Sequence, residues 1–182
     1  MPTHLLLISD THVPARARRL PDPLWRAVDE ADVVVHAGDW VDVATLDALE
    51  ARARHLVGVF GNNDGAELQA RLPEFARFEL EGLRFGVVHE TGPATGRELR
   101  MDAAYAGLPS ADAAGDGPGR PAIDVLVFGH SHIPWDSTTP LGIRLLNPGS
   151  PTDRRRQPAY TMMTALADAG ELRGVMLVPV ER

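Results

Sequence analysis

The sequence predicts a four-layer α/β/β/α sandwich, in which two mixed β-sheets pack together between outer layers of helices. The first part of the chain alternates short, continuously apolar runs with helical patterns, which is typical of buried parallel strands joined by helices. The second part contains strand patterns that follow one another through short turns, which is typical of antiparallel pairing. The 182 residues show no linker or internal repeat, so we expect one domain over residues 1–182.

The first part reads as a β-α-β-α-β unit. Apolar runs predict buried strands over residues 4–8, 32–36 and 55–60. A helix is expected over residues 21–31, because its prolines stand where a helix begins. Residues 43–53, rich in Ala, Leu and Arg, predict a second helix.

The second part is expected to be more antiparallel. Strands over residues 75–80 and 83–89 are joined by Glu81-Gly82, a hairpin turn signal. A helix over residues 97–106 is followed by a Gly-, Ala-, Pro- and Asp-rich surface loop over 108–121. The remaining strands are expected at residues 123–128, 135–138, 143–146, 159–166 and 172–178.

Composition excludes several functional classes. The net charge of −7 argues against extended nucleic-acid binding through a broad basic face. The absence of cysteine excludes disulfides, thiolate metal sites and cysteine nucleophiles. No signal-peptide pattern and no apolar run near the roughly 20 residues of a membrane span is visible, so we expect a cytoplasmic protein without a membrane partner. Whether the chain forms a homo-oligomer stays open.

Metal-binding residue types follow many of the expected strands directly. Side chains at the carboxyl ends of strands converge in α/β folds, and we expect these to form one metal site. Each residue alone has a simpler explanation, such as a helix cap at Asp39 or a turn at Asn62, but the joint pattern favours a metal. The candidates are Asp10, His12, Asp39, Asn62, Asp64, His89, His130 and His132.

The spacing of the candidates supports convergence. Asp10 and His12 are two residues apart, which places them on the same side of an extended chain, and His130 and His132 repeat the spacing. Mixed oxygen and imidazole ligands suit Mn, Fe, Zn, Ni or Co better than Ca. Two divalent ions, two aspartates and one hydroxide sum to about +1, which matches a phosphodiester of charge about −1.

The other histidines are expected to lie outside the ligand set. His36 lies within an expected strand and suits a core or supporting position. His4 and His55 stand where strands begin and receive no function. The arginine run 154–156 is read as a solvated turn, with substrate contact as the alternative.

The ordered set of motifs resembles the calcineurin-like metallophosphoesterase superfamily, and its compact YfcE-like phosphodiesterase branch in particular. The resemblance is carried by Asp10-Thr11-His12, Gly38-Asp39, Gly61-Asn62-Asn63-Asp64, His89 and Gly129-His130-Ser131-His132, and Asn147-Pro148-Gly149-Ser150 resembles the compact branch. It implies the same sandwich fold. It also implies in-line attack at phosphorus by a hydroxide that bridges two divalent ions, with Mn expected first.

The resemblance also implies residue roles. One metal would be bound by Asp10, His12, Asp39 and His132, and the other by Asp39, Asn62, His89 and His130. Asp39, Asn62 and Asp64 would form the catalytic group, with Asp64 orienting its neighbours.

The chain departs from the family pattern at two positions. Asn63 stands where many members have a histidine that can protonate the leaving oxygen, and asparagine cannot act as a general acid. We therefore expect a preference for esters with good leaving groups, or protonation by water. Glu90 follows His89 where family members usually have glycine.

Three functions remain open from the sequence. The first is a phosphodiesterase acting on a small phosphoester, with the segment 91–121 shaping the site entrance. The second is a phosphomonoesterase or nucleotidase on the same metals. The third is a non-catalytic scaffold for protein binding, as in a related retromer subunit, but scaffolds tend to lose ligands and here each expected ligand type is present.

Overall fold

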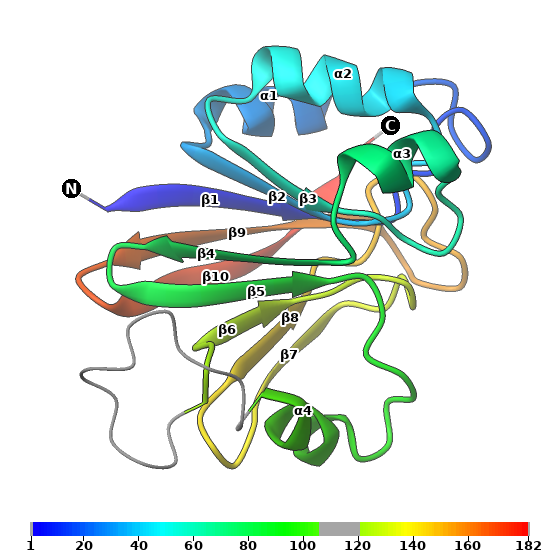
Figure 1. Ribbon diagram of the computed structural model, residues 1–182. Helices are drawn as coiled ribbons and strands as arrows, with labels where there is room; N and C mark the ends of the chain where they lie inside the picture. The colour runs from blue at the N-terminus through cyan, green and yellow to red at the C-terminus, as the bar shows by residue number, and fades with distance from the viewer. Residues whose placement is uncertain (1, 106–120, 182) are drawn as a thin grey trace.

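The computed structural model describes residues 2–105 and 121–181, and it confirms the predicted four-layer sandwich. Two five-stranded sheets pack face to face, with helices covering their outer faces (Figure 1). The first sheet has the order β10-β9-β1-β2-β3. Its strands are β1 (Thr3–Ile8), β2 (Val33–Ala37), β3 (Leu56–Val59), β9 (Tyr160–Asp168) and β10 (Glu171–Val180).

The second sheet has the order β4-β5-β6-β8-β7. In it β5, β6 and β8 run parallel, and β4 and β7 are antiparallel edge strands. In the first sheet β1, β2 and β3 are parallel, β9 pairs antiparallel with β1, and β10 pairs antiparallel with β9. The second sheet contains β4 (Phe75–Leu80), β5 (Leu83–Val88), β6 (Val125–Val127), β7 (Trp135–Thr138) and β8 (Arg144–Asn147).

Helices α1 (Asp22–Glu30) and α2 (Val43–Arg52) cover the first sheet, and α4 (Arg97–Tyr105) covers the second (Figure 1). The structure adds one short helix that the sequence analysis did not predict, α3 (Ala66–Arg71). Only Leu68 of α3 is buried, so its sequence carries no helical hydrophobic pattern to read. Most of the loop predicted over 108–121 lies outside the described residues.

The predicted strand at 123–128 is shorter in the structure. β6 pairs with β5 and β8 only through Val125–Val127, because the chain then turns into the loop that begins at Gly129. The other predicted elements end within about three residues of their predicted positions, which is the usual precision of boundary assignment.

The main core lies between the two sheets. Leu5, Leu7 and Val35 of the first sheet belong to the same buried cluster as Phe85 and Leu146 of the second. The alternate residues of the first sheet, such as Leu6 and Val34, pack instead with α1 and α2. Since residues 5–8 of β1 and 33–35 of β2 are buried on both faces, these runs are continuously apolar instead of alternating.

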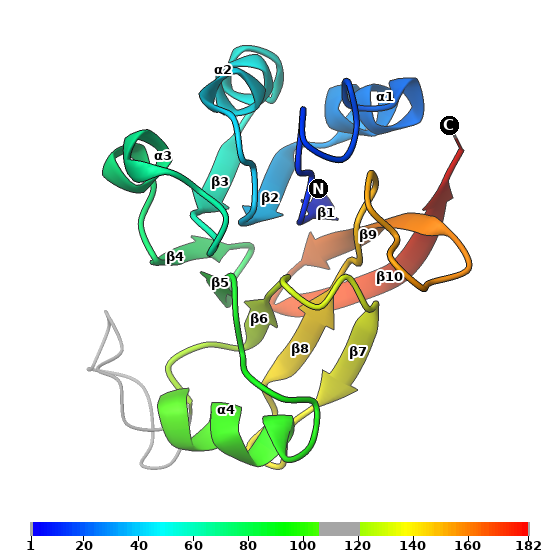
Figure 2. The same cartoon turned by 90° about the vertical axis from the view of Figure 1, so that its right-hand side faces the viewer.

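The carboxyl ends of β1, β2, β3, β5 and β6 open at one edge of the sandwich, which faces the viewer in Figure 2. The loops that follow these strands therefore meet there, as Figure 2 shows. Within the described part of the chain, none of the helices combines the length and apolarity needed to cross a membrane.

Truncation of the intersheet core should be costly. Leu146 is fully buried in this core, so Leu146→Ala is expected to lower the free energy of unfolding by about 2–5 kcal/mol. The matched control is Leu99→Ala on α4, where the side chain is 67% exposed and the expected change is under about 0.5 kcal/mol. Denaturant unfolding measures both, and equal costs would contradict the assigned core.

Candidate metal centre

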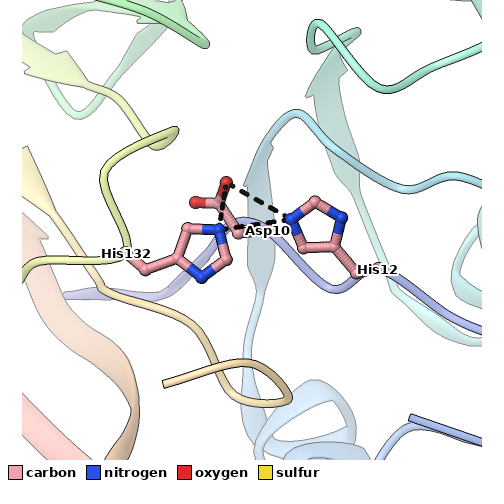
Figure 3. Close-up of side chains that lie close together, drawn as sticks. All are labelled: Asp10, His12 and His132. Carbon is pink, nitrogen blue, oxygen red and sulfur yellow. Dashed lines mark hydrogen bonds and ion pairs between the residues drawn. The ribbon is translucent and has the colours of Figure 1, made fainter. Parts of the chain in front are cut away.

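Three buried side chains from distant parts of the chain meet at this edge. Asp10 and His12 lie on the loop after β1, and His132 lies on the loop after β6 (Figure 3). The His12 Nε2 and His132 Nε2 atoms are 3.2 Å apart. Asp10 Oδ1 lies 3.3 Å from His132 Nε2 and 3.9 Å from His12 Nε2. The side chains of Figure 3 thus direct two imidazole nitrogens and one carboxylate at a common point.

A second group adjoins the first. Asp10, Asp39 and His89 also have ligand atoms within 4.8 Å of one another, and all three residues are buried. Asp39 Oδ2 lies 3.4 Å from His89 Nε2 and 3.5 Å from His12 Nε2. One carboxylate oxygen of Asp39 therefore faces a histidine of each group.

The remaining predicted ligands complete one side of this cluster. Asn62 Oδ1 lies 3.0 Å from His89 Nε2 and 2.8 Å from His130 Nδ1. The backbone N–H of His130 donates to Asp10 Oδ1 at 3.1 Å. The His130 side chain is 40% exposed, so it borders solvent where the other histidines are buried. The structure thus gathers all the predicted ligands at one place.

The backbone that carries these ligands differs from the sequence expectation. Asp10, His12, Asp39, His130 and His132 all have positive φ, between 44° and 66°. The predicted extended conformation around Asp10 and His12, and its repeat around His130 and His132, is therefore wrong. Left-handed backbone is costly for residues other than glycine, and such strain concentrates at functional sites. Here the backbone N–H groups of Asp10 and His12 are held by the carbonyls of Gly38 and Asp39, at 2.9 and 3.1 Å.

Hydrogen bonds on the far side of the rings orient two of the histidines. His89 Nδ1 lies 2.7 Å from the Ala37 carbonyl, and His132 Nδ1 contacts the Asp153 carbonyl. Since a carbonyl can only accept, Nδ1 carries a proton in each ring, and the neutral form of the ring therefore presents the lone pair of Nε2 to the cluster. Sequence analysis gave no role to Asp153, because the contact uses its backbone carbonyl, which every residue type has.

Asp64 points at the backbone instead of the cluster. Its carboxylate accepts hydrogen bonds from the N–H groups of Asp39, Val41 and Gly61, at 3.0, 2.7 and 2.7 Å. It thereby joins the loops after β2 and β3. Burial raises the pKa of Asp64, partly offset by these backbone donors.

Asn63 supports the carboxylate of Asp39. Its backbone N–H donates to Asp39 Oδ1 at 2.8 Å, and its Nδ2 donates to Asp39 Oδ2 at 2.7 Å. Its side-chain amide nitrogen is therefore engaged with the Asp39 carboxylate, although the residue as a whole is exposed. The sequence showed that Asn63 cannot be an acid, and the structure shows the contact that it makes.

A buried layer stands behind the ligands. His36 stacks on Trp40 with ring centroids 3.5 Å apart, and its Nε2 lies 3.0 Å from Thr11 Oγ1. It is therefore a core residue behind the site, as the sequence analysis favoured, whereas His4 and His55 are exposed. Ser150 Oγ donates to the Asp10 carbonyl at 2.7 Å, so the loop after β8 also holds the loop after β1, which carries Asp10 and His12.

Charge in the cluster is strongly coupled. Burial disfavours the charged form of Asp39, but hydrogen bonds and charge from His89 and Asn63 outweigh burial and lower its pKa. Burial alone would lower the pKa of His89, but its contacts, above all the one with Asp39, outweigh burial and raise that pKa. The pKa of His132 is raised in the same way, with Asp10 as the main partner. Burial lowers the pKa of His12 despite both aspartates.

The donor set fits divalent metal ions. Ligands at about 2.0–2.2 Å from an ion stand about 3–4 Å from one another, which is the spacing found here between imidazole nitrogens and carboxylate oxygens. The Nε2 atoms of His12 and His132 face each other, and they can form a hydrogen bond only if one of them carries a proton. Among the described residues, two groups are placed so that they could hold a metal ion, Asp10-His12-His132 and Asp10-Asp39-His89.

Comparison with known proteins identifies the family. The model of the calcineurin-like phosphoesterase superfamily domain matches residues 4–170. This chain belongs to that family. It is 32% identical to a probable metallophosphoesterase of Methanocaldococcus jannaschii over 176 residues, covering 96% of this chain and 80% of the relative. The family is one of metal-dependent phosphoesterases, which agrees with the candidate metal groups.

Solved structures share the fold. A Thermotoga maritima protein has a TM-score of 0.70 and 31% identity, covering 98% of this chain and 99% of that one. Vps29 from Entamoeba histolytica, solved with Zn²⁺, has a TM-score of 0.70, 20% identity and coverage of 97% and 98%. An archaeal phosphodiesterase has a TM-score of 0.64, 19% identity and coverage of 96% and 99%.

The backbone at Gly61 should control metal affinity. A Cβ atom there would overlap Asp39 Oδ1 and lie 2.5 Å from the Asp39 nitrogen, so Gly61→Ala must displace Asp39. We expect Mn²⁺ affinity, measured by calorimetry, to fall about 10–100-fold. The control is Gly65→Ala, because Gly65 has ordinary backbone angles and no atom within 4 Å of its added Cβ. Unchanged affinity in Gly61→Ala would show that Asp39 does not bind the metal.

Metal affinity should rise with pH. His89 and His132 have raised pKa values in the metal-free protein, so they hold protons above their ordinary range. A metal binds the neutral ring and must displace those protons, so affinity increases as the pH rises through the ordinary histidine range and above it. Calorimetry in buffers of different ionisation enthalpy counts the protons released. Affinity independent of pH over that range would contradict ligation by these histidines.

Proposed function

We propose that this protein is a phosphodiesterase that works with two divalent ions at the candidate metal centre. The observation that carries the proposal is the position of Asp39 Oδ2, which lies 3.5 Å from His12 Nε2 and 3.4 Å from His89 Nε2. A carboxylate oxygen that faces one histidine of each ligand group is suited to bind two neighbouring ions at once. The family match over residues 4–170 supports the proposal and agrees with one domain over residues 1–182.

The ligands divide into two sets that share Asp39. The first set is Asp10, His12, Asp39 and His132, and the second is Asp39, Asn62, His89 and His130. When bound, divalent ions supply a lowered pKa for water and positive charge for the phosphoryl oxygens. Mn²⁺ is the ion we propose first, since imidazole and carboxylate ligands together suit it.

The chain itself contributes position and charge. Asp64 fixes the loops that carry Asp39 and Asn62 through three backbone N–H groups. Asn63 holds both oxygens of Asp39 and has no acidic proton to give a leaving group. Ester substrates whose alcohol leaves readily as an anion should therefore react best.

A diester is favoured over a monoester by charge. Two ions, Asp10, Asp39 and one hydroxide sum to about +1, which a diester of about −1 neutralises. The likeness to an archaeal phosphodiesterase supports the same choice. The likeness to Vps29 supports the alternative of a protein-binding scaffold, but the gathered ligand set favours the enzyme.

Hydrolysis of bis(p-nitrophenyl) phosphate with added Mn²⁺ tests the proposal. Asp39→Asn should lower kcat by at least about 100-fold, because it removes the charge shared by both ligand groups. The control is Asp29→Asn, an exposed aspartate paired with Arg52, for which kcat should be unchanged. Absence of turnover in folded, Mn²⁺-loaded protein would reject the enzyme and favour the scaffold.

The ester class has a separate test. The ratio of kcat/KM for bis(p-nitrophenyl) phosphate to that for p-nitrophenyl phosphate should exceed one, because the monoester carries more negative charge than the centre neutralises. A ratio well below one would assign the protein to the phosphomonoesterases.

A further inference from the structure

A pocket of about 340 Å³ lies directly beside the candidate metal centre. Its lining includes His130 and Ser131 from the loop after β6, Glu90 from the loop after β5, Arg97 from α4 and Trp135 from β7. This volume is within the range of about 300–1,000 Å³ typical of small-molecule sites. The pocket shares His130 with the proposed ligand set, so a group bound in it would be attached close to the reacting phosphorus.

Arg97 is an unusual residue to find in this wall. It is 4% exposed, and its guanidinium lies between the rings of Phe128 and Trp135, at 4.8 and 4.4 Å from their centroids. Its Nε donates to Thr91 Oγ1 at 3.0 Å, and one Nη donates to the Gly92 carbonyl at 3.4 Å. Over the described part of the chain, no carboxylate lies within ion-pair distance of it.

This guanidinium has more donors than partners. Arginine carries five N–H donors, and the contacts to Thr91 and Gly92 engage only part of them. Burial lowers the pKa of Arg97, but a guanidinium stays charged at neutral pH. Among the described residues no Arg97 nitrogen is a buried atom without a partner, so the donors that Thr91 and Gly92 leave free reach the pocket surface, where they suit a ligand that brings hydrogen-bond acceptors.

The rest of the pocket indicates what kind of acceptor fits. Ile133, Pro93 and Trp135 supply apolar and aromatic surface, and Ile133 is 47% exposed. Glu90, whose side chain is 57% exposed, adds a negative charge at the same pocket. A second anion would be repelled by Glu90, whereas a neutral ring bearing carbonyl oxygens satisfies Arg97 and covers the apolar wall.

A smaller pocket lies on the other side of Glu90. It has a volume of about 200 Å³ and is lined by Asn62, Gln69, Glu74, His89 and Glu90, among others. Among its described lining residues there is no arginine, and it carries two carboxylates. A phosphodiester has two alcohol groups, and two chemically different pockets on either side of one centre can receive one each.

We propose that the pocket at Arg97 binds the nucleobase of a nucleotide phosphodiester, with the base carbonyls accepting from the guanidinium and the ring covering Ile133 and Trp135. The other alcohol group of the diester, which we expect to carry several hydroxyls, then binds in the smaller pocket beside Glu74 and Glu90. This inference deepens the proposed function and rests on it for the position of the phosphate. It assigns Arg97 as a specificity-determining residue.

Nuclear magnetic resonance tests binding without catalysis. Thymidine added to metal-free protein should shift the Arg97 Nε–H and Trp135 Nε1–H resonances, and inorganic phosphate should leave both in place. Shifts with phosphate and none with thymidine would assign the pocket to anions and overturn the inference. Shifts with thymidine in a protein that hydrolyses no phosphoester would retain the pocket and reject the proposed function.

Kinetics supply the second test. Thymidine 5′-(p-nitrophenyl phosphate) and methyl p-nitrophenyl phosphate share a leaving group, and only the former carries a base. The ratio of their kcat/KM values should fall about tenfold in Arg97→Lys, which keeps the charge and loses the planar donor fork.

Two further variants distinguish loss of base recognition from a general effect of substitution on the fold. Ala94→Trp fills the pocket from its exposed rim and should lower the same ratio about tenfold. Leu99→Ala, on the same helix as Arg97 but 67% exposed and outside the pocket lining, should leave the ratio unchanged. A ratio that is the same in wild type, Arg97→Lys and Ala94→Trp would refute base recognition.

Discussion

The buried carboxylate of Asp39 is the group around which the site is assembled. Its Oδ2 faces His12 on one side and His89 on the other, and both of its oxygens accept hydrogen bonds from Asn63. An unpaired buried carboxylate is expensive, so these partners are needed even before a metal binds. The same contacts place four loops relative to one another, those after β1, β2, β3 and β5, and a shift of Asp39 would therefore disturb all of them.

The loop that carries Asp39 and the neighbouring ligand loops are held mainly by hydrogen bonds from side chains to backbone groups. Asp64 binds three N–H groups from two loops, and Ser150 binds the carbonyl of Asp10 from a third. These bonds hold the left-handed residues that carry the ligands. Strain at a functional site persists only where the surroundings determine it in this way. The site is thus rigid because the loops constrain one another, with the two sheets as a base.

Much of the fold could be predicted from the sequence because buried strands appear in it as runs of apolar residues. The apolar runs at residues 5–8 of β1 and 33–35 of β2 are buried on both faces, where apolar residues are strongly preferred. The candidate ligands could be found because Asp, Asn and His directly follow such runs. The short helix α3 could not, since only Leu68 reaches the core. The contacts of Asn63 with Asp39 and of His132 with a carbonyl also depend on geometry that residue type does not record.

The first ligand group joins residues that are 120 positions apart, His12 and His132. During synthesis, the ribosome releases the aspartate and histidine of the β1 loop long before their partner exists. A complete site therefore forms only after nearly the whole chain can fold, and non-local contacts of this kind form late. A metal ion that needs both histidines could then be bound only once the loop after β6 has reached the first sheet. A chain that ends before His132 would keep Asp10, Asp39 and His89 but lack the first ligand group, which separates completion of the site in time from the early steps of folding.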